Sequence, residues 1–118
     1  MTITPGQYDI VIYQGATFSQ LFTWRDSNNA LVNLTGFTAR MMARSSADSP
    51  TAFLTLTTEN GGIALGGTAG TLMLSRSPAQ TAALPATSGV YDLEVVDGAG
   101  QVHRLLQGNL MVSAEVTR

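Results

Sequence analysis

The sequence contains no cysteine and no lysine, and His103 is its only histidine. Without cysteine the chain can form no disulfide, no thiolate zinc site and no covalent thiol intermediate. With 118 residues it is long enough to bury a core without such a cross-link. The missing cysteine leaves the compartment open, because cytosolic and extracellular virion proteins can both dispense with it.

Charge is scarce as well. Only 12% of the residues are charged, the formal net charge is −2, and all six basic side chains are arginine, against a usual charged share of about 25%. Duplex DNA and anionic membranes both require a dense basic surface, so neither is an expected partner. Interface cores are depleted in charge, so a surface covered by other proteins would explain this composition. A small neutral domain with a threonine-rich surface would explain it equally well.

Long hydrophobic runs are also lacking. No segment approaches the ~18 consecutive apolar residues of a membrane span. The first six residues have neither the basic nor the apolar region of a signal peptide. We therefore expect a protein that is made and kept in the cytosol, or that leaves it by a route needing no signal, such as lysis.

The dominant pattern is the alternation of apolar and polar residues that is typical of β-strands. Each such segment is followed within ten or so residues by a turn rich in Gly, Asn, Asp or Ser, and there is no repeat or linker. This spacing predicts one all-β domain over residues 1–118, an antiparallel β-sandwich of about eight short strands. The candidate segments for these strands are 8–13 (buried on both faces), 18–24, 31–34, 37–44, 52–57, 63–65, 71–75, 90–96, 102–106 and the run from 109.

A single helical signal interrupts the strands. Ser77 is followed by Pro78, and Gln80 stands three residues after Ser77, which is the pattern of a capping box with proline at the first helical position. Pro85 ends the run. We expect a short helical connection near 78–84. Further on, Gly108 lies inside a strand-like run and predicts a bulge or bend.

No catalytic, cofactor-binding or metal-binding residue is predicted. His103 lacks a nearby nucleophile motif, and we expect a half-exposed strand histidine. Asp92 and Glu94 could serve a glycoside hydrolase, but their alternation with apolar residues is that of an outer strand face. The glycine-rich segments 61–62 and 66–70 lack the Gly-Lys-Ser/Thr ending of a phosphate loop and are read as turns.

Several segments, taken together, resemble those of a known group of proteins. The chain resembles small virion-associated proteins of tailed phages, and in particular the N-terminal domain of siphophage baseplate upper proteins. These share a strand, Gln-Gly, an aromatic strand, an Asp turn and a Leu-Thr-Gly turn before the next strand. The similar segments are Tyr8–Phe18, Phe22–Asp26, Leu31–Met41, Gly89–Val95, Asp97–Gly98 and Arg104–Gly108.

The resemblance implies an immunoglobulin-like β-sandwich that docks on a virion and attaches another component. Unlike the baseplate proteins, this sequence ends at Arg118 with no coiled-coil or receptor-binding extension. We therefore expect a non-enzymatic structural protein at the tail, baseplate or fibre attachment, assembled in the host cytoplasm and present in several copies, with other virion proteins as partners. A capsid decoration (cement) protein is the alternative.

Aromatic residues, methionine and arginine are enriched in interface cores. On that basis Trp24, Arg25, Arg40 and Met42 are the candidate contact residues. Two other classes stay open. An enzyme would use Asp92 and Glu94 in a cleft, and a carbohydrate-binding module would need Trp24 or a tyrosine lying flat on the surface.

Overall fold

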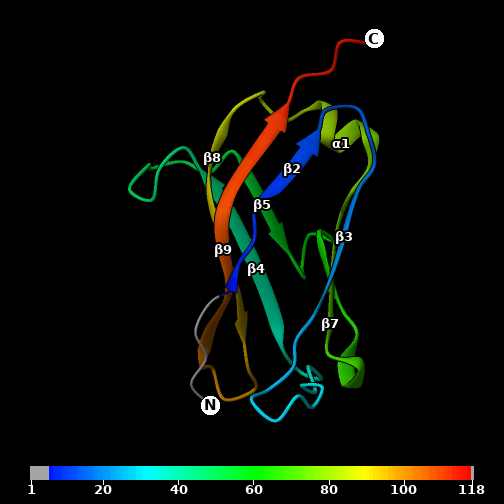
Figure 1. Ribbon diagram of the computed structural model, residues 1–118, viewed down its shortest axis with the longest axis vertical. Coiled ribbons are helices and arrows are strands. Elements are labelled where there is room, and N and C mark those ends of the chain that lie inside the picture. The colour runs from blue at the N-terminus through cyan, green and yellow to red at the C-terminus, as the bar shows by residue number, and fades with distance from the viewer. Residues whose placement is uncertain (1–5, 118) are drawn as a thin grey trace.

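Two β-sheets face each other in the computed structural model, which describes residues 6–117 (Figure 1). The larger sheet runs in the order β1-β9-β8-β4-β5, with β2 also paired to β9, and the smaller sheet runs β3-β7-β6. The strands are β1 (Gly6–Gln7), β2 (Ile10–Tyr13), β3 (Phe18–Thr23), β4 (Thr38–Arg44), β5 (Leu54–Thr57), β6 (Ile63–Leu65), β7 (Thr71–Arg76), β8 (Ser88–Val96) and β9 (Val102–Ser113). A 3₁₀ turn, η1 (Gly67–Ala69), and one α-helix, α1 (Pro78–Ala82), complete the described chain.

The core forms where the alternating apolar rows of the two sheets meet. In β8, Tyr91, Leu93 and Val95 are at most 4% exposed, while the residues between them reach the surface. Leu72 and Leu74 of β7 are buried from the opposite sheet. Full burial of a side chain of this size contributes about 1.5–3 kcal/mol, so this alternation fixes which face of each strand turns inward.

The strand order is that of an immunoglobulin-like sandwich, and the expected fold class is confirmed. In that fold, strands C, F and G form one sheet and B, D and E belong to the other. Here β4, β8 and β9 take the places of C, F and G, and β5 adds a further strand beside C. The first strand of the chain does not join the smaller sheet, because β1 and β2 pair in parallel with β9.

Two details of the sequence prediction are wrong. Segment 31–34 forms no strand. Leu31 makes an isolated bridge to Arg25, and the turn between them is held by Asp26, whose carboxylate accepts from the N–H groups of Asn28 and Ala30. Segment 8–13, which was expected to be buried on both faces, forms β2 and is buried on one face only, since Val11 is 40% and Tyr13 61% exposed. The described residues form nine strands where about eight were expected.

The predicted helix is confirmed, and its capping box is present. Ser77 accepts from the backbone N–H of Gln80, while the Gln80 side chain accepts from the backbone N–H of Ser77. The helix packs its fully buried Thr81 against the turn between β2 and β3. The Thr81 hydroxyl accepts from Gly15 N–H at 3.0 Å and lies 2.9 Å from the carbonyl oxygen of Ala16.

We expect Thr81→Val to destabilise the protein by about 1–3 kcal/mol, because it removes the hydrogen bonds that the buried hydroxyl makes with the partly buried backbone groups of Gly15 and Ala16. Urea unfolding followed by circular dichroism measures the change. Thr81→Ser is the control, since it keeps the hydroxyl and should lose less. A Thr81→Val protein as stable as the wild type would show that this contact contributes nothing.

The register of β8 with β9 shifts between Leu93 and Glu94, so the expected irregularity in β9 lies a few residues before Gly108.

A second anchor joins the first strands to β8 and β9, and it depends on Gly108. A Cβ atom there would lie 2.4 Å from the carbonyl oxygen of Tyr8. Only glycine lets the backbone come this close, and the Tyr91 hydroxyl then donates to that same carbonyl.

We expect Tyr91→Phe to cost about 1–3 kcal/mol, because the carbonyl of Tyr8 loses its donor in a partly buried place. Tyr13→Phe is a matched control, since Tyr13 is 61% exposed and surface changes of this kind usually stay within about 0.5 kcal/mol. The measurement is again urea unfolding. Equal effects of the two substitutions would contradict the anchoring function.

The same anchor predicts a dependence on alkaline pH. Burial raises the pKa of Tyr91 from 10.0 to about 12, and the nearby Asp9 carboxylate adds to the rise. Between pH 10 and about 12 the unfolded chain releases this proton while the folded chain keeps it, so the free energy of unfolding falls as the pH rises. We expect a shallower fall in Tyr91→Phe than in the wild type.

Candidate interaction face

Cross-strand rows of polar and charged side chains cover the outer face of the larger sheet. The pairing register places Arg40 of β4 opposite Glu94 of β8, and Glu94 opposite Arg104 of β9. In the next row, Met42 lies opposite Asp92. The charged face, as we call it, consists of Arg40, Met42, Arg44, Asp92, Glu94 and Arg104.

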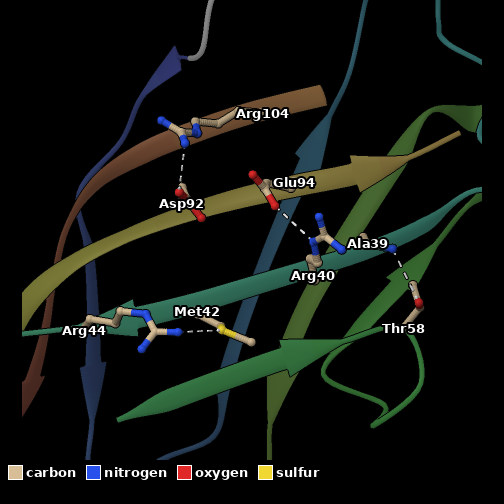
Figure 2. A network of polar contacts seen from close by, with 8 residues as sticks. All are labelled: Ala39, Arg40, Met42, Arg44, Thr58, Asp92, Glu94 and Arg104. Carbon is tan, nitrogen blue, oxygen red and sulfur yellow. Dashed lines mark hydrogen bonds and ion pairs between the residues drawn. The ribbon is translucent and has the colours of Figure 1, made fainter. Parts of the chain in front are cut away.

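Two ion pairs lie on this face, one within the first row and one between the two rows (Figure 2). Arg40 Nε lies 3.0 Å from Glu94 Oε1, and Arg104 Nη2 lies 3.5 Å from Asp92 Oδ2. Both arginine side chains are about half exposed, at 50% and 49%. Exposed pairs of this kind contribute little to stability, so the fold should depend little on this network.

The charged face is hollowed. An open depression of about 650 Å³ is lined by the charged face together with Tyr91, Val90, Gln107 and neighbouring residues. Three guanidinium groups border it, against two carboxylates. The Arg44 guanidinium donates to the Ser49 carbonyl at 3.1 Å and to the Met42 sulfur at 3.4 Å. Within residues 6–117, no carboxylate forms an ion pair with Arg44, so the depression has more positive than negative side chains.

The four predicted contact residues do not lie together. Arg40 and Met42 both project from β4 into the depression. Trp24 is partly buried and packs edge-on against Phe37, with ring centroids 6.5 Å apart. Arg25 is exposed and donates to the carbonyl of Asn29 in its own turn. The structure therefore brings two of the four together and places the other two elsewhere.

Arg44, Asp92, Glu94 and Arg104 were not predicted as contact residues. The period of two in 38–44 and 90–96 already places the first three on outer strand faces. What alternation cannot provide is the register between strands that are distant in sequence, and the register is what brings Arg40 beside Glu94.

The residues considered for catalysis lie in two places: His103 beside a turn, and Asp92 and Glu94 on the charged face. His103 Nε2 lies 3.1 Å from Asp97 Oδ2. The pKa of Asp97 is lowered, first by the backbone N–H of Gln101 and then by the His103 side chain. Asp97 also accepts from Ala99 N–H, so these contacts close the turn between β8 and β9. Asp92 and Glu94 do border a depression, but each is paired with an arginine.

Residues 6–117 contain no group of three or more His, Cys, Asp or Glu side chains that could hold a metal ion. Within the same part of the chain, no helix is long and apolar enough to cross a membrane.

No protein-family model matches the sequence, and no curated protein matches it either. Solved structures do match. One of them is the extracellular domain of the voltage-gated sodium channel β4 subunit, whose parallel homodimers are described as explaining its role in cell–cell adhesion. It is 13% identical, the match covers 98% of each chain, and the TM-score is 0.48. A likeness at this level carries nothing about function.

We expect a double-mutant cycle on Arg40→Ala and Glu94→Ala to give a coupling of only about 0.2–1 kcal/mol, because the pair is exposed and screened by water. Urea unfolding of the wild type, both single variants and the double variant measures it. A coupling of about 3–5 kcal/mol, as for a buried pair, would show that the network holds the fold together.

Proposed function

We propose that this chain is a non-enzymatic structural protein of a tailed bacteriophage virion, an adaptor at the tail, baseplate or fibre attachment. It acts by packing against other virion proteins and is present in several copies, assembled in the host cytoplasm. The sequence resemblance of residues 8–41 and 89–108 to baseplate upper proteins supports the virion setting. The charged face supports the mode of action.

The observation that carries the mode of action is the chemistry of this face. It combines arginine and methionine, both enriched in protein interfaces, around an open depression with spare guanidinium donors. Charges of both signs steer a partner into one orientation and reject wrong partners. The interspersed Asp92 and Glu94 make the same face unsuited to a nucleic acid backbone, which requires uniform positive charge.

Two motifs on which the resemblance rests have a structural function in this chain. Gln14 of the Gln-Gly pair donates to the carbonyl of Leu84 at 2.7 Å and accepts from Glu115 N–H at 3.0 Å. Leu34 of the Leu-Thr-Gly turn is 1% exposed, and Gly36 has φ +82°. Both motifs hold turns in place. Because these motifs hold turns, we expect the choice of partner to depend on the exposed faces.

We expect Arg44→Glu to prevent incorporation of the protein into particles, because it reverses the charge of the guanidinium that has no carboxylate partner of its own. Phage produced with the variant is purified, and the copies of this protein per particle are measured by gel densitometry. Arg25→Glu is the matched control, since it makes the same charge change on an exposed arginine outside the charged face. Normal incorporation of Arg44→Glu would contradict the proposed mode of action.

Purified wild-type particles also show whether this protein lies at the tail or on the capsid. Cross-linking of wild-type virions should join this protein to tail, baseplate or fibre components, with a copy number on the scale of the tail. A copy number on the scale of the capsid subunits, with cross-links to the shell, would overturn the adaptor in favour of a decoration protein. Absence from purified particles would overturn the virion setting altogether.

A further inference from the structure

The long edge of the smaller sheet is formed by β3. This strand pairs with β7 on one side only, and no strand lies on its other side within the described part of the chain. An unpaired edge presents a row of N–H and C=O groups that can pair with another chain. At six residues, Phe18–Thr23 is long enough for such pairing.

The strand geometry identifies the groups on this edge. Trp24 N–H donates to the carbonyl of Gly70, on the β7 side. In an antiparallel pair every second residue faces its partner strand, so Phe22 and Gln20 face β7 like Trp24. Ser19, Leu21 and Thr23 therefore direct their backbone N–H and C=O groups away from β7, to the open side.

On the corresponding edge of the larger sheet, formed by β5, a side chain already bonds the outward backbone groups. Asn60 lies beside β5 and takes the place of a neighbouring strand: its Nδ2 donates to the carbonyl of Thr55 at 3.0 Å, and its Oδ1 accepts from Thr57 N–H at 2.9 Å. These are the outward backbone groups of β5, since Thr58 N–H turns inward to Ala39 of β4. The β3 edge has no such side-chain guard among the contacts of residues 6–117.

The other two edges offer little. β6 has three residues, and the side chain of Ile63 at its start is buried. β1 and β2 are short, with two and four residues, and they are separated at Tyr8, whose carbonyl is held by Tyr91. The β3 edge is therefore the longest edge that is open in this part of the chain.

The surroundings of this edge favour a second copy of the same chain. Natural sheets protect open edges with charged side chains, above all lysine, and β3 carries no charge. The outward side chains beside it are also uncharged, so two copies can approach without repulsion. These side chains are Ser19, Leu21, Thr23, Ala64, Thr71, Met73 and Ser75.

We propose that two copies pair antiparallel along β3, with Leu21 opposite Leu21 of the second copy and Ser19 opposite Thr23. In this register each opposing pair exchanges both of its N–H···O bonds, so the two edges satisfy each other. Leu21 is 50% exposed in the single chain, and the pairing places it beside its symmetry mate. The two smaller sheets become one continuous sheet, and both charged faces stay free for other partners.

The inner side of the seam adds apolar contact. A small cavity of about 110 Å³ opens between β3 and β9, lined by Phe22, Leu72, Leu105, Leu106 and neighbouring apolar side chains. Tyr8 lies edge-on against Phe22, with ring centroids 5.2 Å apart. In the proposed register Phe22 lies opposite Gln20 of the second copy, so the added strand would cover this lining and shield it from water.

Sedimentation equilibrium and amide hydrogen exchange test the pairing on the full chain. The wild type should have twice the monomer mass, and the amides of Ser19, Leu21 and Thr23 should exchange slowly. Leu21→Lys should be monomeric, with fast exchange at these three positions and unchanged slow exchange at Gln20 and Phe22, which are bonded to β7. A monomeric wild type with fast-exchanging edge amides overturns the proposal.

Leu31→Lys is the matched control, because Leu31 is 44% exposed and lies outside β3. It should remain a dimer. If both lysine variants became monomeric with unchanged circular dichroism, or if neither did, the β3 edge would not be the interface.

A cross-link then tests the register. The chain has no cysteine, so Leu21→Cys introduces a single thiol. In the proposed register the two Cα atoms lie about 5.5 Å apart, within the range of about 4.4–6.8 Å that a disulfide bridges. Mild oxidation should join Leu21→Cys chains in pairs and leave Leu31→Cys single. Equal cross-linking of the two variants overturns the register.

Discussion

The alternation of side chains along β8 is the constraint on which both the core and the charged face depend. Tyr91, Leu93 and Val95 turn inward and are at most 4% exposed, so Asp92 and Glu94 have to turn outward. A slip of one residue would exchange the two sets, burying two carboxylates and exposing three large side chains. The cost of burying unpaired charge therefore fixes the register of β8, and with it the positions of the ion pairs on the outer face.

Local features of this chain could be predicted from its sequence, and distant pairings could not. The helix after Ser77 and the turn from Asp97 to Gly100 depend on neighbouring residues, and both form as expected. Two features depended on a partner far away in sequence. Strand β2 runs in parallel beside β9. Position 108 requires glycine because the backbone of Tyr8 lies too close for a Cβ atom. The same limit applies to the candidate site, where alternation indicates outward residues but not which ones meet.

Two side-chain amides perform a task that backbone usually performs. Gln14 links the turn before β3 to the carbonyl of Leu84 and to Glu115 N–H, and Asn60 completes the outer edge of β5. Each amide carries a donor and an acceptor on one rigid group, which is why it can replace a peptide unit of a missing strand. In this chain, uncharged amide side chains thus form hydrogen bonds with backbone groups that no strand pairs. The β3 edge has no such amide among the described residues, and it is longer than the other edges that lack one.

The parallel pairing of β1 and β2 with β9 has a mechanical consequence. The chain enters the larger sheet through β1 and β2 and leaves it through β9, which points the same way along the long axis (Figure 1). A pull on the two ends of the chain would slide these strands past each other rather than peel them apart. The interstrand bonds would then share the load and have to break together. Such a geometry resists tension along its length.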